Sequence, residues 1–221
     1  VNAYYKASDN IKISITESHL DYFFIDGEVT TITTYSAVML EDGVHTIVAC
    51  DKAGNTAETS FIVDKVAPII YLANYYNATE TVYLDVIEDH LASVLFDGKE
   101  TSEKEYSAAE LSEGIHSVTM TDLAGNVTKV TFVVDKTAPI ISHKEYYKES
   151  DTFYISVSET NPDYIEFDGT ATEITVWQCT QLEEGVHTIV AYDKAGNSAV
   201  ASFIVDKVAP VISATANGKE I

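Results

Sequence analysis

The sequence predicts an all-β protein built from tandem sandwich repeats. Three observations support this prediction. One block of sequence recurs at a fixed period, apolar and polar residues alternate along several short stretches, and turn motifs with glycine separate those stretches. No stretch has a convincing helical period, although residues 99–113 are ambiguous. Short alternating strands joined by tight turns are typical of a β-sandwich.

The repeat has a period of 71 residues (135 minus 64) and needs no gap. The segment Asp-Lys-x-Ala-Pro begins at Asp64, Asp135 and Asp206, and its proline favours a stiff, extended connection. We therefore place the domain boundaries at these segments. The predicted domains are residues 1–64, which lack the first strand, residues 65–135, residues 136–206, and residues 207–221, which begin a fourth repeat.

The alternation also predicts which face of each strand is buried. Ile11, Ile13 and Ile15 alternate with polar residues, and the same phase recurs in the other two repeats. A later strand begins at His45 and the last one runs through Phe61, again with a constant phase. Asp-Gly pairs, which are hairpin signals, follow another apolar stretch at 26–27, 97–98 and 168–169.

The charge excludes several classes of partner. The chain has 35 acidic and 13 basic residues, all 13 of them lysine, so its formal net charge is −22. A phosphate backbone or an anionic membrane surface needs a basic patch, so we expect no nucleic-acid partner. No apolar run is long enough to predict membrane insertion within this sequence. Like-charge repulsion also predicts a monomer.

The motifs resemble those of a known family. The order of Gly43-x-His45, an alternating strand, Asp51-x-Ala-Gly-Asn, Phe61-x-Val-Asp and Ala-Pro is similar to bacterial immunoglobulin-like repeats of surface adhesins and other secreted proteins. The resemblance covers all three repeats. It implies tandem Ig-like sandwiches arranged as an elongated rod, and an extracellular location on a bacterial cell surface or in a secreted protein.

Carboxylates at the strand ends form the main candidate site. Glu17 and Asp51 continue the buried phase of two strands, which run in the same direction if the strand order is Ig-like. Their copies and the linker aspartates would then meet at one pole of each later repeat, where clustered hard oxygen ligands suit Ca²⁺. The predicted ligands are Asp64, Glu88, Asp89 and Asp122 at the first junction and Asp135, Glu159 and Asp193 at the second. The alternative is that these residues only cap tight turns.

Tyrosine pairs recur near the start of each repeat. Adjacent strand residues face opposite ways, so one ring of each pair should point inward and the other outward. We consider Tyr5, Tyr76 and Tyr147 as a candidate ligand-binding set that stacks on sugars. The alternative is that the rings cover a junction or a sheet edge.

Histidine and cysteine suggest structural roles. His45 and its copies His116 and His187 should be buried strand-end residues bonded to backbone, and His90, which Asn161 replaces in the third repeat, should serve a turn. Cys50 and Cys179 occupy different positions in non-adjacent repeats. We expect two free thiols, with Cys50 at least partly exposed.

The favoured function is a non-catalytic spacer that presents an adhesive or catalytic part lying elsewhere. One alternative is that the repeats themselves bind host glycan or protein, gaining affinity from multivalency. Another is an accessory segment of a secreted carbohydrate-active enzyme. Paired carboxylates also occur in glycoside hydrolases, but three copies without another catalytic group argue against catalysis.

Overall fold

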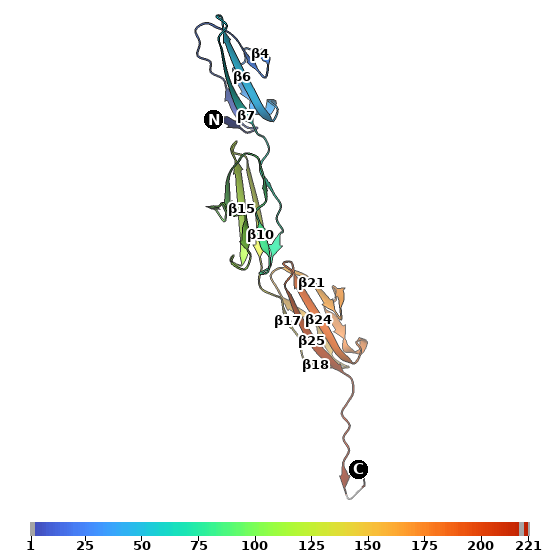
Figure 1. Ribbon diagram of the computed structural model, residues 1–221. Coiled ribbons are helices and arrows are strands. Elements are labelled where there is room, and N and C mark those ends of the chain that lie inside the picture. The colour runs from blue at the N-terminus through green and yellow to red at the C-terminus, as the bar shows by residue number, and fades with distance from the viewer. Residues whose placement is uncertain (1–2, 217–218, 221) are drawn as a thin grey trace. The chain divides into compact units, whose positions relative to one another are not determined.

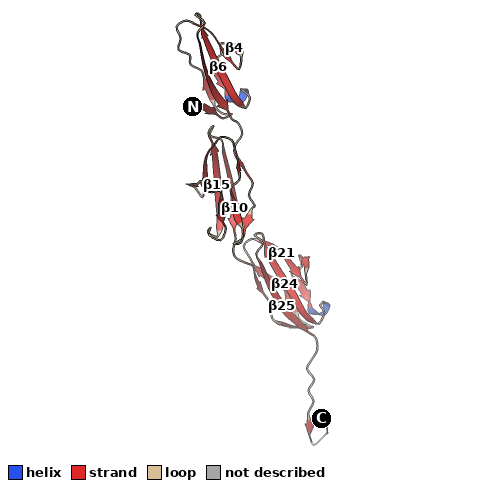
Figure 2. Cartoon of the chain, viewed as in Figure 1, coloured by secondary structure: helices blue, strands red, loops and turns tan. Residues whose placement is uncertain are grey.

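The structure of this protein is a computed structural model, which describes residues 3–216 and 219–220 (Figure 1). It consists of strands and loops, with two three-residue 3-10 turns, η1 (Ala37–Met39) and η2 (Cys179–Gln181) (Figure 2). The all-β prediction is confirmed. The ambiguous residues 99–113 contain strands β13 (Lys99–Glu100) and β14 (Glu105–Ser107). No helix in the described ranges is long and apolar enough to span a membrane.

The chain divides into two units. Unit 1 comprises Val1–Asn74, Thr81–Tyr106 and Ile115–Val133, and unit 2 comprises Tyr75–Glu80, Ser107–Gly114 and Val134–Ile221. The division passes through the middle repeat. The boundaries predicted at residues 64, 135 and 206 stay a prediction.

Unit 1 contains the five-stranded sheet β1-β7-β6-β3-β4. Within it β1 pairs with β7 in parallel, with Tyr5 opposite Val63, while the other neighbours are antiparallel. These five strands are β1 (Ala3–Tyr5), β3 (Leu20–Ile25), β4 (Glu28–Thr30), β6 (Gly43–Asp51) and β7 (Thr56–Val63). A second layer pairs β2 (Asn10–Lys12) with β5 (Thr34–Ser36). A parallel first strand beside the last, faced by a separate antiparallel pair, is the arrangement of an Ig-like sandwich.

Unit 1 also holds most of the middle repeat. Its sheet has the order β13-β12-β15-β16, formed with β12 (Leu91–Phe96), β15 (Gly114–Asp122) and β16 (Val127–Val134). The opposite layer includes β10 (Thr81–Tyr83) and the pair formed by β8 (Ile69–Ile70) and β11 (Val86–Ile87). Strand β9 (Tyr75–Tyr76) belongs to unit 2.

Unit 2 contains the third sandwich. Its large sheet, β18-β25-β24-β21-β22, consists of β18 (Tyr146–Lys148), β21 (Pro162–Phe167), β22 (Thr170–Thr172), β24 (Gly185–Asp193) and β25 (Ser198–Asp206). The facing strands pair β17 (Ile140–Ser142) with β20 (Ser156–Ser158) and β19 (Thr152–Tyr154) with β23 (Val176–Gln178). A final hairpin joins β26 (Thr215–Ala216) to β27 (Lys219–Glu220).

The predicted buried faces are confirmed. Ile11 and Ile13 are buried, as are Phe61 and Val63, and their copies follow the same phase. In unit 2 the core gathers Phe153, Phe203 and Val205, with the single tryptophan, Trp177, packed against them. Each core holds tightly packed aromatic and branched residues, so burial of their apolar surface is the main stabilising contribution.

The predicted Asp-Gly hairpins are confirmed. Asp26 has φ of 51° and Gly27 has φ of 82° between β3 and β4. Two consecutive positive φ values define the tight turn that suits the right-handed twist of paired strands, and Asp-Gly tolerates them best. The same geometry recurs at Asp97 and Asp168.

The linker lysines bind the repeat that precedes them. Lys65 Nζ donates to the carbonyl of Leu40 after η1, and Lys207 Nζ donates to the carbonyl of Leu182 after η2 at 2.6 Å. Lys136 Nζ likewise bonds the carbonyl of Leu111. The Asp-Lys motif therefore closes each repeat before the proline begins the next.

Both cysteines are free, as predicted, but the expected exposure of Cys50 is wrong. Cys50 is buried with 9% exposure because Tyr22 lies opposite it on the neighbouring strand β3. The hydrogen bond with the Cys50 thiol raises the pKa of Tyr22. Cys179 is fully buried in η2, and this burial raises the pKa of its thiol.

Candidate functional site

The Asp-x-Ala-Gly-Asn turn positions the central acid of each candidate site. In unit 2, Asp193 Oδ1 accepts hydrogen bonds from the backbone N–H of Ala195 at 2.9 Å and of Asn197 at 2.8 Å. Its Oδ2 accepts from Asn197 Nδ2 at 2.7 Å. Asp51 and Asn55 make the same contacts in the first repeat. The turn is thus capped by its own aspartate, as the alternative interpretation expects.

The asparagine of this turn also binds the linker. Asn126 Nδ2 donates to the backbone carbonyl of Asp64 at 2.9 Å within unit 1. Asn197 Nδ2 donates to the carbonyl of Asp135 at 2.8 Å within unit 2. One amide therefore connects the linker carbonyl to the turn carboxylate at both junctions.

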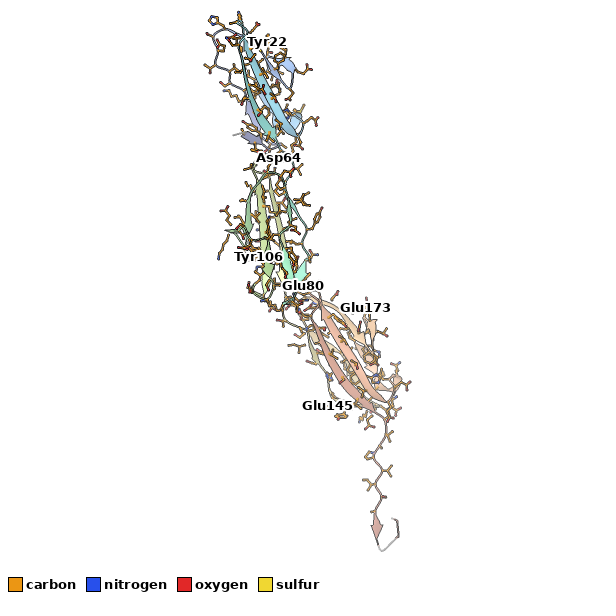
Figure 3. All side chains as sticks on the ribbon, viewed as in Figure 1. Tyr22, Asp64, Glu80, Tyr106, Glu145 and Glu173 are labelled. Carbon is orange, nitrogen blue, oxygen red and sulfur yellow. The ribbon has the colours of Figure 1, made fainter. Side chains whose placement is uncertain are left out.

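The first cluster lies at the end of β7 and comprises Asp64, Glu88 and His90. Each offers a ligand atom within 4.8 Å of the others. Asp64 Oδ2 lies 3.5 Å from His90 Nδ1, and Glu88 Oε1 accepts from the His90 backbone N–H at 2.8 Å. The ring of Tyr4 packs against His90 at 5.0 Å. Figure 3 labels Asp64, whose side chain is mostly buried.

The second cluster lies within unit 2 and comprises Asp135, Glu159 and Asp193. Asp135 belongs to the linker, Glu159 follows β20, and Asp193 ends β24 before the turn to β25. Their ligand atoms again lie within 4.8 Å of one another. Asp135 and Asp193 are 4% and 2% exposed, so two carboxyl groups are held away from water. Asp135 Oδ2 accepts from Asn161 Nδ2 at 2.7 Å, and Glu159 Oε1 accepts from the Asn161 N–H at 2.9 Å.

The structure brings together some of the predicted ligands but not all. Asp135, Glu159 and Asp193 meet, as do Asp64 and Glu88. Asp89 is exposed and Asp122 bonds its own turn through Asn126, so neither belongs to the first cluster. His90 takes a place there that sequence reasoning gave only to a turn. Its replacement by Asn161 was the available signal, because both side chains face the linker aspartate with a nitrogen.

The two clusters differ in the metals they could hold. Three carboxylates without a nitrogen ligand suit Ca²⁺, a hard cation that takes oxygen ligands. Two carboxylates and an imidazole suit a borderline cation such as Zn²⁺ better. Metal binding at either cluster stays a prediction, because the hydrogen bonds described above also explain why these acids lie where they do.

A histidine–aspartate pair forms a second recurring polar site in each repeat. His45 Nδ1 lies 2.6 Å from Asp26 Oδ2, and its Nε2 lies 2.9 Å from the carbonyl of Glu41. His187 makes equivalent contacts with Asp168 and the carbonyl of Glu183. Because both ring nitrogens face acceptors, only the imidazolium form can donate to both. The predicted backbone hydrogen bond is confirmed, while the carboxylate partner was missed.

Burial acts to raise the pKa of Asp26, but hydrogen bonds from His45 and from the Thr46 N–H lower it below its usual value overall. The ring of His45 stacks on Phe61 at 5.2 Å. In unit 2 the ring of His187 stacks on two phenylalanines, Phe167 at 5.6 Å and Phe203 at 5.4 Å.

The structure buries two of the three tyrosines in the candidate sugar-binding set, and sugar binding by this set stays a prediction. Tyr76 and Tyr147 are 8% and 5% exposed, and Tyr5 is half-buried against Phe61. These tyrosines are the inward members of each pair. Tyr5 packs against Phe61, and Tyr147 packs against Phe153 and Phe203. The outward member in the third repeat is Tyr146, which is 59% exposed.

Comparison with known proteins gives remote likenesses only. No family model and no curated protein matches the sequence. Among solved structures, SGBP-B of the Bacteroides ovatus mixed-linkage glucan utilization locus, in complex with a mixed-linkage heptasaccharide, has 14% identity and a TM-score of 0.26. The match covers 93% of this chain and 65% of that one. The chain thus spans about two thirds of that protein's length.

Two animal proteins have similarly low sequence identities and TM-scores. Murine CEACAM1b has 14% identity and a TM-score of 0.35 over 61% of this chain and 96% of that one. Extracellular domains 3–5 of Drosophila OTK have 9% identity and a TM-score of 0.32 over 93% and 94%. These scores are too low to carry an argument, so the Ig-like assignment depends on the strand order described above.

Proposed function

We propose that this chain is a non-catalytic spacer segment of a secreted or cell-surface bacterial protein. Its tandem Ig-like repeats would hold an adhesive or catalytic part at a distance. The observation that carries the proposal is the asparagine bridge, in which Asn126 and Asn197 each bind the carbonyl of a linker aspartate. A flexible tether would not need such a bridge at both linkers.

The linker lysines support the same proposal. Lys136 Nζ bonds carbonyls on the N-terminal side of its linker, while the carbonyl of Asp135 accepts from Asn197 on the C-terminal side. The connecting residues are therefore restrained from both sides. Restraint of short linkers is what a stiff spacer requires.

Small-angle scattering on the whole chain tests this function. Three sandwiches with strands of about 23 Å, joined end to end, should give a maximum dimension on the order of 100 Å. The double variant Asn126→Ala/Asn197→Ala should broaden the distribution of distances. Asn55→Ala is the matched control, because Asn55 caps the same turn without a linker carbonyl among its described partners. A compact particle, or equal broadening in the control, would contradict the spacer proposal.

Ligand binding by the repeats is a second candidate, favoured by one surface in unit 2. Tyr164 is 44% exposed and stacks on Tyr192 at 4.5 Å. The two rings border a groove of 570 Å³ that also includes Asp163, Thr172 and Glu173 (Figure 3 labels Glu173). Exposed aromatic rings beside hydroxyl and carboxylate groups suit a glycan or a protein ligand.

A glycan array with the wild-type chain and Tyr164→Ala tests this candidate. Tyr146→Ala is the control, since Tyr146 is exposed but does not line the groove. Loss of signal in the Tyr164 variant alone would support binding in the groove. An array without signal for the wild type would remove glycans from consideration. The flanking sequence of the whole gene would show whether the segment accompanies a carbohydrate-active enzyme.

A further inference from the structure

The groove that Tyr164 and Tyr192 border in unit 2 has a counterpart in the middle repeat. We call the first the third-repeat groove and the second the middle groove. The middle groove lies within unit 1, has a volume of 250 Å³, and is lined mostly by residues that precede those of the third-repeat groove by the repeat period. The two sites can therefore be compared residue by residue.

The same backbone hydrogen bond adjoins each groove, which confirms that they are equivalent. The Leu84 N–H donates to the carbonyl of Lys104 at 2.8 Å, next to the middle groove. The Ile155 N–H donates to the carbonyl of Thr175, also at 2.8 Å, next to the third-repeat groove. Thr175 thus stands where the middle repeat has a lysine.

This exchange changes the charge of the groove. Lys104 lines the middle groove together with two glutamates, so that groove supplies its own positive charge. The third-repeat groove is lined by Asp163 and Glu173, and none of its described lining residues is basic. A ligand of this groove is therefore favoured if it brings a cation.

The aromatic residues of the grooves differ as well. Tyr164 and Tyr192 occupy the positions of Ser93 and Thr121 in the middle repeat. Their rings stack at 4.5 Å with an interplanar angle of 17°, while Tyr164 stays 44% exposed. Burial raises the pKa of Tyr164, and the charges of Tyr192 and of nearby carboxylates, Asp163 among them, act in the same direction. An exposed ring face beside carboxylates is a favourable place for a cation.

The remaining part of the lining is apolar. Ile155 is buried, and Val157 and Ile165 pack against the core of the third repeat. Such a surface can cover the methylene groups of a long basic side chain, whose charged end stays at the polar rim.

We propose that the third-repeat groove binds an arginine side chain presented by an extended segment of a partner protein. The guanidinium would stack on Tyr164 while Asp163 and Glu173 accept its hydrogen bonds. Arginine suits this site better than lysine, because its planar group can both stack on a ring and donate to a carboxylate through two N–H groups. All 13 basic residues of this sequence are lysine, so a second copy of it cannot supply the arginine. The inference rests on the second candidate function, ligand binding in the groove, and not on the spacer proposal.

An NMR titration of the ¹⁵N-labelled chain with the peptide acetyl-Gly-Arg-Gly-Arg-Gly-amide tests the site. Shift changes should concentrate in residues 155–157, 162–165 and 172–175, and they should weaken as ionic strength rises. The same peptide with lysine in place of arginine should bind several-fold more weakly. Shift changes spread evenly over the acidic surface, or equal affinity for both peptides, would overturn the proposal.

A lysine placed in the groove tests the charge argument. Thr175→Lys restores the lysine of the middle groove and should weaken binding of the arginine peptide by about tenfold, because like charges would then meet. Thr170→Lys is the matched control. It adds the same charge where the middle repeat has Lys99, but Thr170 does not line the groove, so binding should change less than about twofold. Equal weakening by both variants would overturn the proposal.

The aromatic contact is tested by Tyr164→Ala, which should weaken binding of the arginine peptide by about fivefold. Tyr146→Ala should leave it unchanged, since Tyr146 does not line the groove. A chain that ignores the peptide but gives a glycan signal dependent on Tyr164 would overturn this inference and keep the second candidate function. A chain that binds neither would remove both.

Discussion

The two acidic clusters occupy equivalent positions in successive repeats, yet they solve the problem of buried charge differently. In the first, Asp64 faces the ring of His90, which can carry a positive charge, at 3.5 Å. In the second, Asp135 faces the neutral amide of Asn161 at 2.7 Å, and Asp193 joins the group. One difference, histidine in the first cluster and asparagine beside the second, thus accompanies a change from two carboxylates with an imidazole to three carboxylates. The second cluster therefore has the greater need for an external cation.

The largest effect should come from removing the buried acid of the second cluster. Asp193→Ala deletes three hydrogen bonds to a carboxylate, and the backbone N–H groups of Ala195 and Asn197 lose their side-chain acceptor. We expect a loss of about 3 kcal/mol in the free energy of unfolding. Guanidinium unfolding followed by Trp177 fluorescence reports on this repeat alone, since Trp177 is the one tryptophan.

Asp51→Ala is the matched control for that measurement. It removes the same turn contacts where the carboxylate is more exposed, so its effect should be smaller. Circular dichroism follows its unfolding. Equal losses in both variants would show that the turn, and not the cluster, determines the stability.

The second largest effect should be the stabilisation of the third repeat by Ca²⁺ bound at the second cluster. On chelator-treated protein, Ca²⁺ at a hundredfold excess over its dissociation constant should stabilise the third repeat by about 2.7 kcal/mol. Glu159→Gln should abolish this gain, because it removes one of three carboxylates while an oxygen remains for the Asn161 N–H. Glu17→Gln changes the equivalent residue of the first repeat, which belongs to neither cluster, and should keep the gain. Absence of binding heat and of any shift in the Trp177 transition would refute the calcium prediction.

The turn of the first repeat, whose Asp51 belongs to neither cluster, shows how pH affects the stability contributed by the turn alone. Hydrogen bonds from the Asn55 side chain and backbone lower the pKa of Asp51 below its usual value. The stability gained from this carboxylate is therefore present above the unfolded pKa, near 3.9, and is lost as pH falls through the lower folded value. Asn55→Ala should move the pKa back up, as measured by carboxyl ¹³C NMR. An unchanged titration would show that the asparagine does not set it.

The smallest effect should follow exchange of the distinguishing residue. His90→Asn gives the first cluster the donor of the second, and Asn161→His does the reverse. The His90 side chain is 36% exposed and its contact with Asp64 is long, so we expect a change within about 0.5 kcal/mol in calorimetric unfolding. A loss of several kcal/mol would mean that this histidine is essential to the first cluster.

Much of the fold could be predicted because it depends on local patterns. Alternation at Ile11, Ile13 and Ile15 and the positive φ of Asp26-Gly27 are properties of short segments. The 3-10 turns η1 and η2 escaped prediction because three residues are too few to show a period. The burial of Cys50 also escaped, because it depends on Tyr22 in a neighbouring strand.

The candidate sites were harder because they depend on spatial neighbours. The expected strand direction correctly predicted that Glu159 lies near Asp193. It also wrongly placed Asp122 in the first cluster, although the Asp122 carboxylate accepts a hydrogen bond from Asn126 in its own turn. The pairing of His45 with Asp26 joins residues 19 positions apart, one in β6 and the other in the turn between β3 and β4. Alternation assigned one ring of each tyrosine pair to the core, but it did not show that Tyr76 and Tyr147 were the inward rings.

The parallel pairing of β18 with β25 has a mechanical consequence. β18 stands near the start of the third repeat and β25 ends it, and Tyr147 lies opposite Val205 in their ladder. Tension applied through the chain pulls β18 and β25 in opposite directions along their own length. The hydrogen bonds between them are then strained in shear and must break together, whereas a hairpin pulled open at its end would lose them one after another. This repeat is thus built to resist stretching along the direction in which its own backbone transmits force.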